Sequence, residues 1–510
     1  MSSEPFYITT AISYPNGRPH IGHAYEAIAA DAIARFQRMQ GREVRFQTGT
    51  DEHGLKMVQT ARDRGVEVGD LAREMSDQFQ AMCDALNISY DKFQRTTDPA
   101  HHRASVAIWE AMRANGDLYL DRYEGWYSVR DEAYYEEKEL TDGEGGVRLS
   151  PQGTPVEWTV EESWFFKLSK YENTLLELYA NQPDFIQPDS RRNEVVRFVE
   201  GGLRDLSMSR TSFDWGVKVP GSPDHVMYVW VDALTNYLTG LGYPDATPDM
   251  EKFWPASLHL IGKDIVRFHA VYWPAFLMSA GIALPKQVFG HGFLLARDGA
   301  KMSKSAGNVV DPMALAERYG VDALRYFLLR EVSFGSDGTW SEEAIVTRCN
   351  ADLANNLGNL AQRCLSMIAK NCGGVVPEDI CDTRAPHLGE LRAQLEELMA
   401  EMRLHEALSV VFEAASATNQ YFADMAPWAE RKVNPALADG ILYRTAEAIR
   451  QIAILASWAI PDSAGKILTL LGQIGVPSLD DLDNALRPGT ILPAPQGVFP
   501  RLELPAEVAA

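Results

Sequence analysis

Cysteine is scarce in this chain of 510 residues, with five scattered copies and no Cys-x-x-Cys pair. That spacing excludes a disulfide framework and argues against a zinc knuckle built from paired thiolates. We therefore expect a reducing compartment, no metal ligands and no structural zinc. The five cysteines are Cys83, Cys349, Cys364, Cys372 and Cys381.

Long apolar runs are also missing. The longest stretch without a charge or a histidine, 270–285, has 16 residues and contains Pro274. It is shorter than the ~20 residues with which a helix spans a bilayer. The first residues lack the basic region and the apolar core of a secretion signal. We expect a cytoplasmic protein that does not bind a membrane.

Basic residues are few relative to acidic ones, because 48 Lys and Arg stand against 70 Asp and Glu, for a net charge of −22. This balance excludes a protein that coats polyanions without discrimination. Positive charge is instead local. Segment 286–304 has four basic residues against one acidic residue, and segment 348–370 has three against one. Any nucleic acid must therefore bind through such patches.

The first fifty residues alternate between strand and helix patterns. Residues 6–12 read as a strand, 22–40 as an amphipathic helix and 43–47 as a second strand. This order is the start of a parallel α/β sheet, in which ligands bind at the carboxyl ends of strands. Ligand-binding residues are therefore expected in the loops 11–23 and 48–54.

The rest of the chain divides by composition. A turn-rich, aromatic insertion is followed by further strand patterns at 226–231, 257–261 and 287–295, and then by consecutive helical patterns. The last residues are rich in proline and cannot form a long helix. We predict an α/β segment, a β-rich insertion, a second α/β segment, a helical bundle, and a helix with a proline-rich tail at 1–116, 117–225, 226–343, 344–460 and 461–510.

His20-Ile21-Gly22-His23 stands where the loop after the first strand enters a helix. Two imidazoles at a helix N-terminus can face an anion that the first-turn N–H groups already favour. Gly22 allows the backbone to approach such an anion closely. The tetrapeptide is a candidate phosphate site, and the alternative is an N-capping histidine beside a packed one.

A second motif, Lys301-Met302-Ser303-Lys304-Ser305, follows a strand in a loop that contains Asp298-Gly299. Two lysines with small hydroxyl residues suit the transient neutralisation of a polyphosphate by a loop that closes and opens. An ordinary surface loop has a similar composition. Alone, this motif is weak evidence.

Together and in this order, the two motifs resemble the HIGH and KMSKS signatures of class I aminoacyl-tRNA synthetases, and most of all the methionyl-tRNA synthetase family. The resemblance implies a Rossmann-type parallel-sheet catalytic domain that is split by an inserted β-rich connective domain. An α-helical bundle for anticodon binding would follow. Further matching segments are 11–17, 48–54, 228–233, 261–265, 268–269 with Trp273, and 355–363.

The resemblance implies ATP-dependent attachment of methionine to tRNA(Met) through a methionyl-adenylate, with Mg²⁺. Catalysis would depend on His20, His23, Lys301 and Lys304. Gly22, Glu26 and Ser303 would join them in binding ATP. Asp51 would hold the ammonium of methionine, supported by Arg210 from the insertion. The methionine pocket would be formed by Ala11, Ile12, Tyr14, Asp51, Trp230, Ala233, Leu234, Tyr237, Ile265 and His269.

Aromatic walls suit a thioether, because contacts between sulfur and aromatic rings contribute ~0.3 to 1.5 kcal/mol. The alternative for residues such as Trp230 and Tyr237 is that they are ordinary core aromatics. Many relatives carry cysteine zinc knuckles in the insertion, but the matching stretch 126–132 contains no cysteine. The resemblance therefore points to a branch without that zinc site.

Asn355, Asn359 and Arg363 are spaced i, i+4 and i+8, which places them on one face of a helix. The family uses the matching positions, together with the one at Trp428, to read the anticodon. Such a tryptophan stacks on a splayed base while amide and guanidinium groups bond base edges. Without the resemblance, a polar stripe of this kind is usually a solvent-facing surface.

Three other interpretations stay open on the residues alone. The chain resembles class I synthetases in general, so another amino acid is conceivable, although 117–225 is too short for a large editing insertion. A small-molecule adenylyltransferase can share the first motif, and an inactive tRNA-binding relative can share the whole fold. Because the chain ends soon after the helical segment, we expect a monomer.

Overall fold

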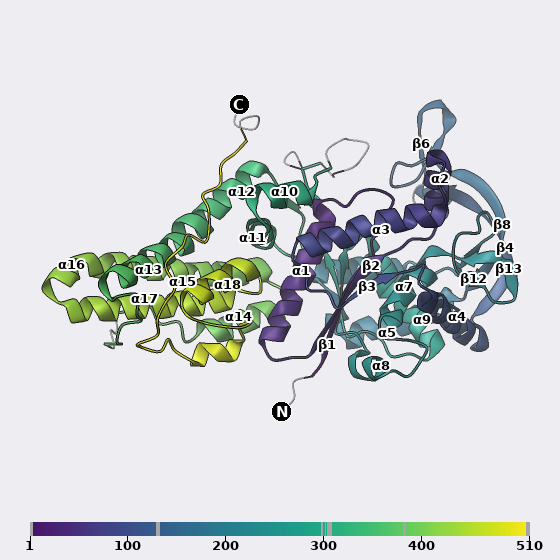
Figure 1. Cartoon of the computed structure of the whole chain (residues 1–510). Coiled ribbons are helices and arrows are strands. Elements are labelled where there is room, and N and C mark those ends of the chain that lie inside the picture. The colour runs from purple at the N-terminus through teal and green to yellow at the C-terminus, as the bar shows by residue number, and fades with distance from the viewer. Residues whose placement is uncertain are drawn as a thin grey trace.

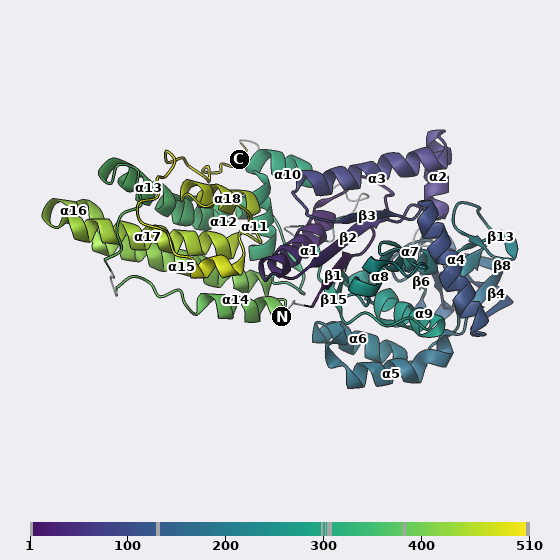
Figure 2. The same ribbon diagram turned by 60° about the horizontal axis from the view of Figure 1, so that its bottom comes forward.

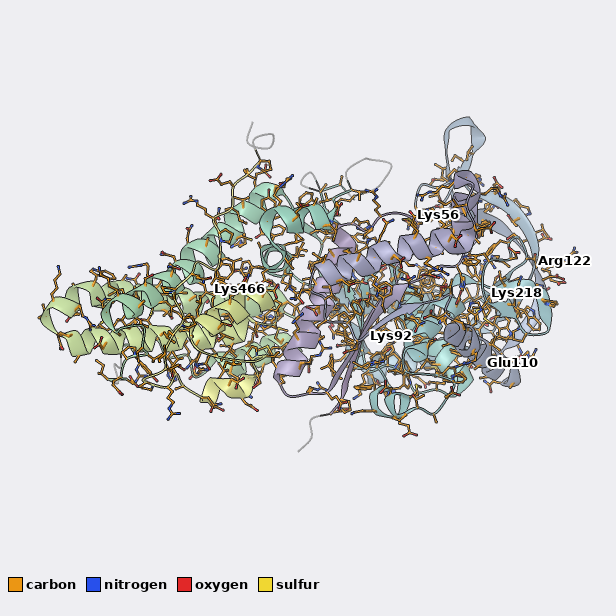
Figure 3. The ribbon with its side chains drawn as sticks, viewed as in Figure 1. Lys56, Lys92, Glu110, Arg122, Lys218 and Lys466 are labelled. Atoms are coloured by element: carbon orange, nitrogen blue, oxygen red, sulfur yellow. The ribbon has the colours of Figure 1, made fainter. Side chains whose placement is uncertain are left out.

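The computed structural model describes residues 4–128, 133–296, 299–300, 302, 309–380 and 384–505. Lys301, Ser303 and Lys304 lie outside the described residues. The described chain is elongated, with an α/β body at one end and a helical bundle at the other (Figure 1). With side chains drawn, Lys466 lies on the bundle, whereas Arg122 and Lys218 lie at the far end of the body (Figure 3).

A six-stranded sheet forms the centre of the body. Its strands are ordered β3-β2-β1-β14-β15-β9, and every pairing is parallel. Ile8 of β1 lies between Phe46 of β2 and Leu258 of β14. The predicted parallel α/β sheet is therefore confirmed. The strands are β1 Phe6–Thr10, β2 Val44–Thr50, β3 Lys92–Arg95, β9 Ile186–Gln187, β14 Leu258–Gly262 and β15 Val288–His291.

Side chains of the central strands alternate between two cores, as the period of two in a strand requires. Leu258, Leu260 and Phe289 pack with α1, whereas Ile261 and Val288 pack with α4, α7 and α9. Helices therefore cover both faces of the sheet (Figure 2). The helices of the body are α1 Ile21–Met39, α2 Leu55–Arg64, α3 Val68–Ala85, α4 Pro99–Ala114, α7 Val229–Thr239, α8 Pro248–Phe253 and α9 Trp273–Ala280.

The insertion is built mainly on two antiparallel sheets, ordered β10-β8-β4-β5 and β11-β13-β12. It also holds helices α5 and α6, and its short strand β9 joins the edge of the central sheet. The elements are β4 Leu118–Ser128, β5 Ala133–Tyr135, β6 Thr141–Asp142, β7 Arg148–Leu149, β8 Glu157–Phe166, α5 Glu172–Asn181, α6 Asp189–Glu200, β10 Leu206–Ser207, β11 Ser209–Arg210, β12 Lys218–Val219 and β13 Ser222–Met227.

The strand predicted at 226–231 is wrong. Strand β13 ends at Met227 and belongs to the small antiparallel sheet, and α7 begins at Val229. The run of valines and aromatics has high strand propensity, but propensity yields to tertiary packing. Asp232 lies in the first turn of α7, where the helix dipole favours a carboxylate.

Consecutive helices follow the body, as predicted. A π-helix, Asn350–Gly358, joins α12 to α13. Within the described residues, no helix is both long and apolar enough to cross a membrane. Short strands β16 Leu294–Leu295 and β17 Gly338–Thr339 precede the bundle. The helices are α10 Pro312–Tyr319, α11 Val321–Glu331, α12 Glu342–Cys349, α13 Asn359–Asn371, α14 Leu391–Ala400, α15 Leu404–Met425, α16 Pro427–Val433, α17 Pro435–Ala456 and α18 Pro461–Leu470.

Body and bundle share one apolar core, which runs from α1 through α11 to α17. A buried ion pair reinforces this junction. Arg325 of α11 donates from Nη2 to Oδ2 of Asp31 on α1 at 2.6 Å. The same guanidinium donates from Nε to the carbonyl oxygen of Ala459, just after α17, at 3.0 Å. The helix that begins with the first motif is thereby tied to the bundle.

Candidate active site

The N-terminus of α1 is capped by the two histidines of the first motif. Nδ1 of His20 accepts from the N–H of Gly22 at 3.1 Å, and Nδ1 of His23 accepts from the N–H of His20 at 3.1 Å. The two rings stack with centroids 3.7 Å apart. The alternative that a histidine caps this helix is therefore confirmed. Because both caps use Nδ1, the ring hydrogen lies on Nε2, which can donate to a phosphate oxygen.

Glu26, one turn further along α1, pairs with a histidine that sequence reasoning missed. Its Oε2 is 2.9 Å from Nε2 of His291, at the carboxyl end of β15. Burial alone lowers the pKa of His291, but the hydrogen bond to Glu26 and its charge outweigh burial and raise that pKa. His291 lies inside the strand predicted at 287–295, whereas in the structure β15 ends at His291, so the sequence pattern did not place this histidine at the edge where ligands bind.

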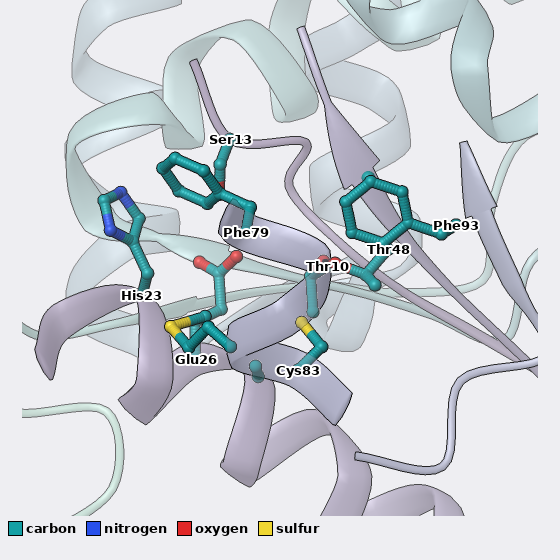
Figure 4. Close-up of a pocket in the computed structure, with 11 residues that line it drawn as sticks. Thr10, Ser13, His23, Glu26, Thr48, Phe79, Cys83 and Phe93 are labelled. Carbon is teal, nitrogen blue, oxygen red and sulfur yellow. Dashed lines mark hydrogen bonds between the residues drawn. The ribbon is translucent and has the colours of Figure 1, made fainter. Parts of the chain in front are cut away.

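A small cavity lies beside this pair (Figure 4). His23 and Glu26 reach it from α1, and Phe79 reaches it from α3. The ring of Phe79 meets the ring of His23 edge-on, with centroids 4.9 Å apart. Thr10 at the end of β1 donates to Thr48 of β2 at 2.7 Å. The phosphate candidate thus borders the carboxyl ends of β1 and β2.

An aromatic cluster lies beyond β14 and along α7. Trp230 stacks on Phe268 with ring centroids 3.6 Å apart. The hydroxyl of Tyr237 donates to Nε2 of His269 at 2.6 Å, and Nδ1 of His269 donates to the carbonyl oxygen of Ile265 at 3.0 Å. Burial lowers the pKa of His269 to about 4. His269 is therefore neutral at neutral pH.

Most of the predicted methionine pocket comes together. Ala11, Trp230, Leu234, Tyr237 and Ile265 belong to one apolar cluster. Ala233 and His269 are buried on the same elements, and Ile12 is half-buried. The hydroxyl of Tyr14 instead accepts from the N–H of Met57, in the first turn of α2, at 3.2 Å.

Asp51 lies buried directly after β2. Its N–H donates to the carbonyl oxygen of Ser13 at 2.9 Å. The N–H of Ser13 donates to the carbonyl oxygen of Gly49, also at 2.9 Å. These bonds join the loops after β1 and β2. A Cβ on Gly49 would lie 2.0 Å from the carbonyl oxygen of Gln94, so only glycine fits between β2 and β3. Asp51 is thus held at the same edge as Ala11.

Arg210 is buried on β11 and does not face solvent. Nη1 donates to Oγ of Ser207 and to the carbonyl oxygen of Ser209, both at 2.7 Å. The guanidinium also lies 3.7 Å from the ring centroid of Tyr228, the residue before α7. The insertion therefore brings a cation to the start of the helix that forms the aromatic wall.

The predicted anticodon residues lie on the π-helix 350–358, on α13 and on α16. Asn355 is exposed in the π-helix, and Asn359 is exposed at the start of α13. Arg363 lies 5.3 Å from the ring centroid of Trp428, which is 45% exposed. Asn359 and Arg363 are four residues apart within α13, but Asn355 precedes it, so the α-helical spacing does not extend over all three. Ala426, with a φ of 39°, bends the chain between α15 and α16.

The family is decided by comparison with known proteins. A family model described as tRNA synthetases class I (M) matches residues 6–144 and 147–365, and one described as anticodon binding domain of methionyl tRNA ligase matches 382–505. The methionine–tRNA ligase of Mesorhizobium japonicum is 58% identical, over 98% of both chains. That of Mycobacterium tuberculosis is 57% identical, over 98% of this chain and 99% of its own.

This chain belongs to the methionine–tRNA ligase family. Solved structures agree with the sequence comparison. The Mycobacterium tuberculosis methionyl-tRNA synthetase in complex with methionyl-adenylate matches with a TM-score of 0.95 and 56% identity, over 98% of this chain and 100% of that one. The apo form of that enzyme matches with a TM-score of 0.88 and 53% identity, over 98% of this chain and 99% of that one. The family and the fold predicted from the two motifs are confirmed.

A buried cluster beside Asp51 was not predicted from the sequence of this methionine–tRNA ligase family member. It consists of His53, His101 and Asp232, which come from three separate segments. Asp232 stands in the matching segment 228–233, so the family motif was the signal available. Among the described residues, no three His, Cys, Asp or Glu side chains are grouped as a metal site requires.

Proposed function

We propose that this protein attaches methionine to tRNA(Met) in two steps. The carboxylate of methionine attacks the α-phosphorus of ATP, and pyrophosphate leaves. A ribose hydroxyl of the terminal adenosine then attacks the carbonyl carbon of the adenylate, and AMP leaves. The observation that carries the proposal is the aromatic cluster along α7. Asp232 of this helix bonds His53, whose N–H donates to Asp51, at the same sheet edge as the capped N-terminus of α1.

Neither step needs a protein nucleophile, so the residues act by positioning and by stabilising charge. His20 and His23 donate from Nε2 to phosphate oxygens, next to the N–H groups of the first turn and the close approach at Gly22. Glu26 bonds His291 and raises its pKa, which favours the protonated form of a further histidine at this edge. Lys301, Ser303, Lys304 and Mg²⁺ neutralise the charge that develops as pyrophosphate leaves.

Selection of methionine follows from charge and shape. Asp51 pairs with the ammonium, and Arg210 supports the aspartate from the insertion. The side chain enters a pocket whose histidine is neutral and whose walls are aromatic, which suits a polarizable thioether better than a charged or strongly polar group. Leu234 is 1% exposed and belongs to the same apolar cluster as Trp230 and Tyr237.

The bundle reads the anticodon in this proposal. Trp428 stacks on a splayed base, and Asn355, Asn359 and Arg363 bond base edges. We expect Trp428→Ala to weaken tRNA(Met) binding by tenfold or more, since the loss of one stacked base costs ~1 to 3 kcal/mol. Methionine-dependent exchange between ATP and pyrophosphate stays unchanged in this variant. Equal losses of both activities would contradict the separate role of the bundle.

The same proposal assigns the catalytic domain to 1–116 and 226–343, the connective domain to 117–225 and the anticodon domain to 344–460. We assign residues 461–510 to a C-terminal helix and tail. We propose that the protein acts as a monomer in the cytoplasm, where tRNA is charged for translation. Light scattering at several protein concentrations tests the monomer, and a mass that rises with concentration would contradict it.

The decisive experiment is the exchange of pyrophosphate into ATP with each of the twenty amino acids. We expect exchange with methionine alone, and at least a hundredfold loss in Lys304→Ala, because the loop acts on the developing charge. Exchange with another amino acid would favour a different class I synthetase. No exchange with any of them, together with intact tRNA binding, would favour an inactive tRNA-binding relative.

A further inference from the structure

Two histidines from separate segments bond the buried carboxylate of Asp232. Oδ2 of Asp232, in the first turn of α7, accepts from Nδ1 of His53 at 2.6 Å. Oδ1 of Asp232 accepts from Nε2 of His101, on α4, at 2.7 Å. None of the three residues is more than 6% exposed. Both oxygens are therefore engaged by donors from different parts of the body.

His101 also contacts the far end of α7. The hydroxyl of Thr239 donates to the carbonyl oxygen of Thr235 at 3.0 Å. The same hydroxyl lies 3.0 Å from Nδ1 of His101. Nε2 of His101 is the donor toward Asp232, because an ionised carboxylate can only accept.

The cluster is charged despite its burial. Burial alone raises the pKa of Asp232, but the charge of His53 and the hydrogen bonds from His101 and His53 outweigh burial and hold that pKa well below its usual range. Burial lowers the pKa of His53, whereas Asp232, Asp51 and Glu52 raise it, and the net shift is upward. The carboxylate of Asp232 thus stays ionised, and its charge favours the protonated form of His53.

This cluster connects the two halves of the amino-acid site. The N–H of His53 donates to Oδ1 of Asp51 at 3.4 Å, so His53 contacts the residue assigned to the ammonium. Asp232 stands on α7 between Trp230 and Ala233, in the helix that carries the aromatic wall. A tilt of α7 against the end of β2 would change the distance between the two halves.

A buried ion cluster adds little net stability compared with apolar packing of the same volume, because desolvation offsets the attraction. Its place between Asp51 and α7 therefore favours a role in geometry. We propose that Asp232 is a positioning residue, which sets α7 relative to Asp51 through His53 and His101 and thereby determines the affinity for the amino acid. This inference rests on the proposed function, since it concerns the same site.

The test is the exchange reaction with Asp232→Asn, which keeps the shape of the side chain but replaces one acceptor by a donor. We expect the KM for methionine to rise at least tenfold, while the KM for ATP changes less than twofold. Asp117→Asn is the matched control. Asp117 is 1% exposed and accepts from Tyr171 and Ser279, outside the site. It should lower the thermal midpoint and leave both KM values unchanged.

A purely structural role for Asp232 would lower the midpoint without changing the KM for methionine, and this result overturns the inference. Variants at His101 decide the matter if Asp232→Asn does not fold. His101→Gln keeps a donor near Oδ1 and should stay within twofold of the wild-type KM, whereas His101→Leu should raise it. Equal KM values in both variants overturn the inference.

The wild-type protein separates this inference from the proposed function. If the wild type exchanges pyrophosphate with no amino acid, the proposed function fails. If it exchanges with methionine and Asp232→Asn keeps the wild-type KM, the proposed function stands and only the role of Asp232 fails.

Discussion

His269 makes the amino-acid pocket sensitive to acid. Its pKa is lowered to about 4 by burial, from an ordinary value of 6.5 in the unfolded chain. Between these two values only the unfolded chain binds the proton, so stability falls as the pH decreases from 6.5 to 4. The loss amounts to about 3 kcal/mol over that window.

We therefore expect the urea midpoint of the wild type to fall between pH 6.5 and 4.5, and to fall less in His269→Gln. Part of the decrease remains in the variant, because burial also lowers the pKa of His259 well below its ordinary value. Parallel midpoint curves for the two proteins would show that His269 does not titrate in this window.

Tyr237 supplies the hydrogen bond that Nε2 of His269 accepts. Tyr237→Phe leaves that buried nitrogen without its donor, which costs about 1 to 3 kcal/mol of stability. We expect a lower thermal midpoint and a raised KM for methionine. Tyr443→Phe is the control, because the buried hydroxyl of Tyr443 donates to the carbonyl oxygen of Leu486 at 2.9 Å, in the helical part of the chain and outside the site. It should lower the midpoint alone.

The first turn of α1 serves two purposes that one substitution can separate. His20→Asn replaces the capping imidazole by an amide whose oxygen is also a good N-cap, so the thermal midpoint should change little. The Nε2 donor is lost, and we expect exchange to fall by about 10²- to 10³-fold. Wild-type exchange in His20→Asn would mean that His20 only caps the helix.

Elements were predictable where one pattern dominates. The strand, helix and strand of the first fifty residues differ clearly in apolar period, and α1 ends within a residue of the prediction, before Gly41 with its φ of 75°. The helix that begins within 226–231 was not predictable, because the valines and aromatics of this segment favour a strand. Helix α7 forms here because it packs on α4. Local propensity could not resolve that conflict.

The site was predictable only in part, for a related reason. His20, Gly22 and His23 are close in sequence, so a motif reveals them. The pairs that complete the site join residues 265 apart for His291 and Glu26, and 179 apart for His53 and Asp232. No spacing rule connects such residues, and only the parallel sheet brings them to one edge.

At the scale of the whole molecule, the two halves are joined by a shared core and by the buried pair of Arg325 and Asp31. Both side chains are fully buried, and removing one partner of such a pair costs about 3 to 5 kcal/mol. The loss falls on the junction, because Arg325 also bonds the chain just after α17. The junction should therefore decide whether body and bundle unfold together.

We expect one calorimetric transition for the wild type and two for Arg325→Met, because the body and the bundle then unfold separately. Arg450→Met is the matched control, since Arg450 is equally buried but pairs with Glu447 on the same helix, at 2.7 Å. It should lower the temperature of a single transition. A single shifted transition in Arg325→Met as well would show that the apolar core alone keeps the two halves cooperative.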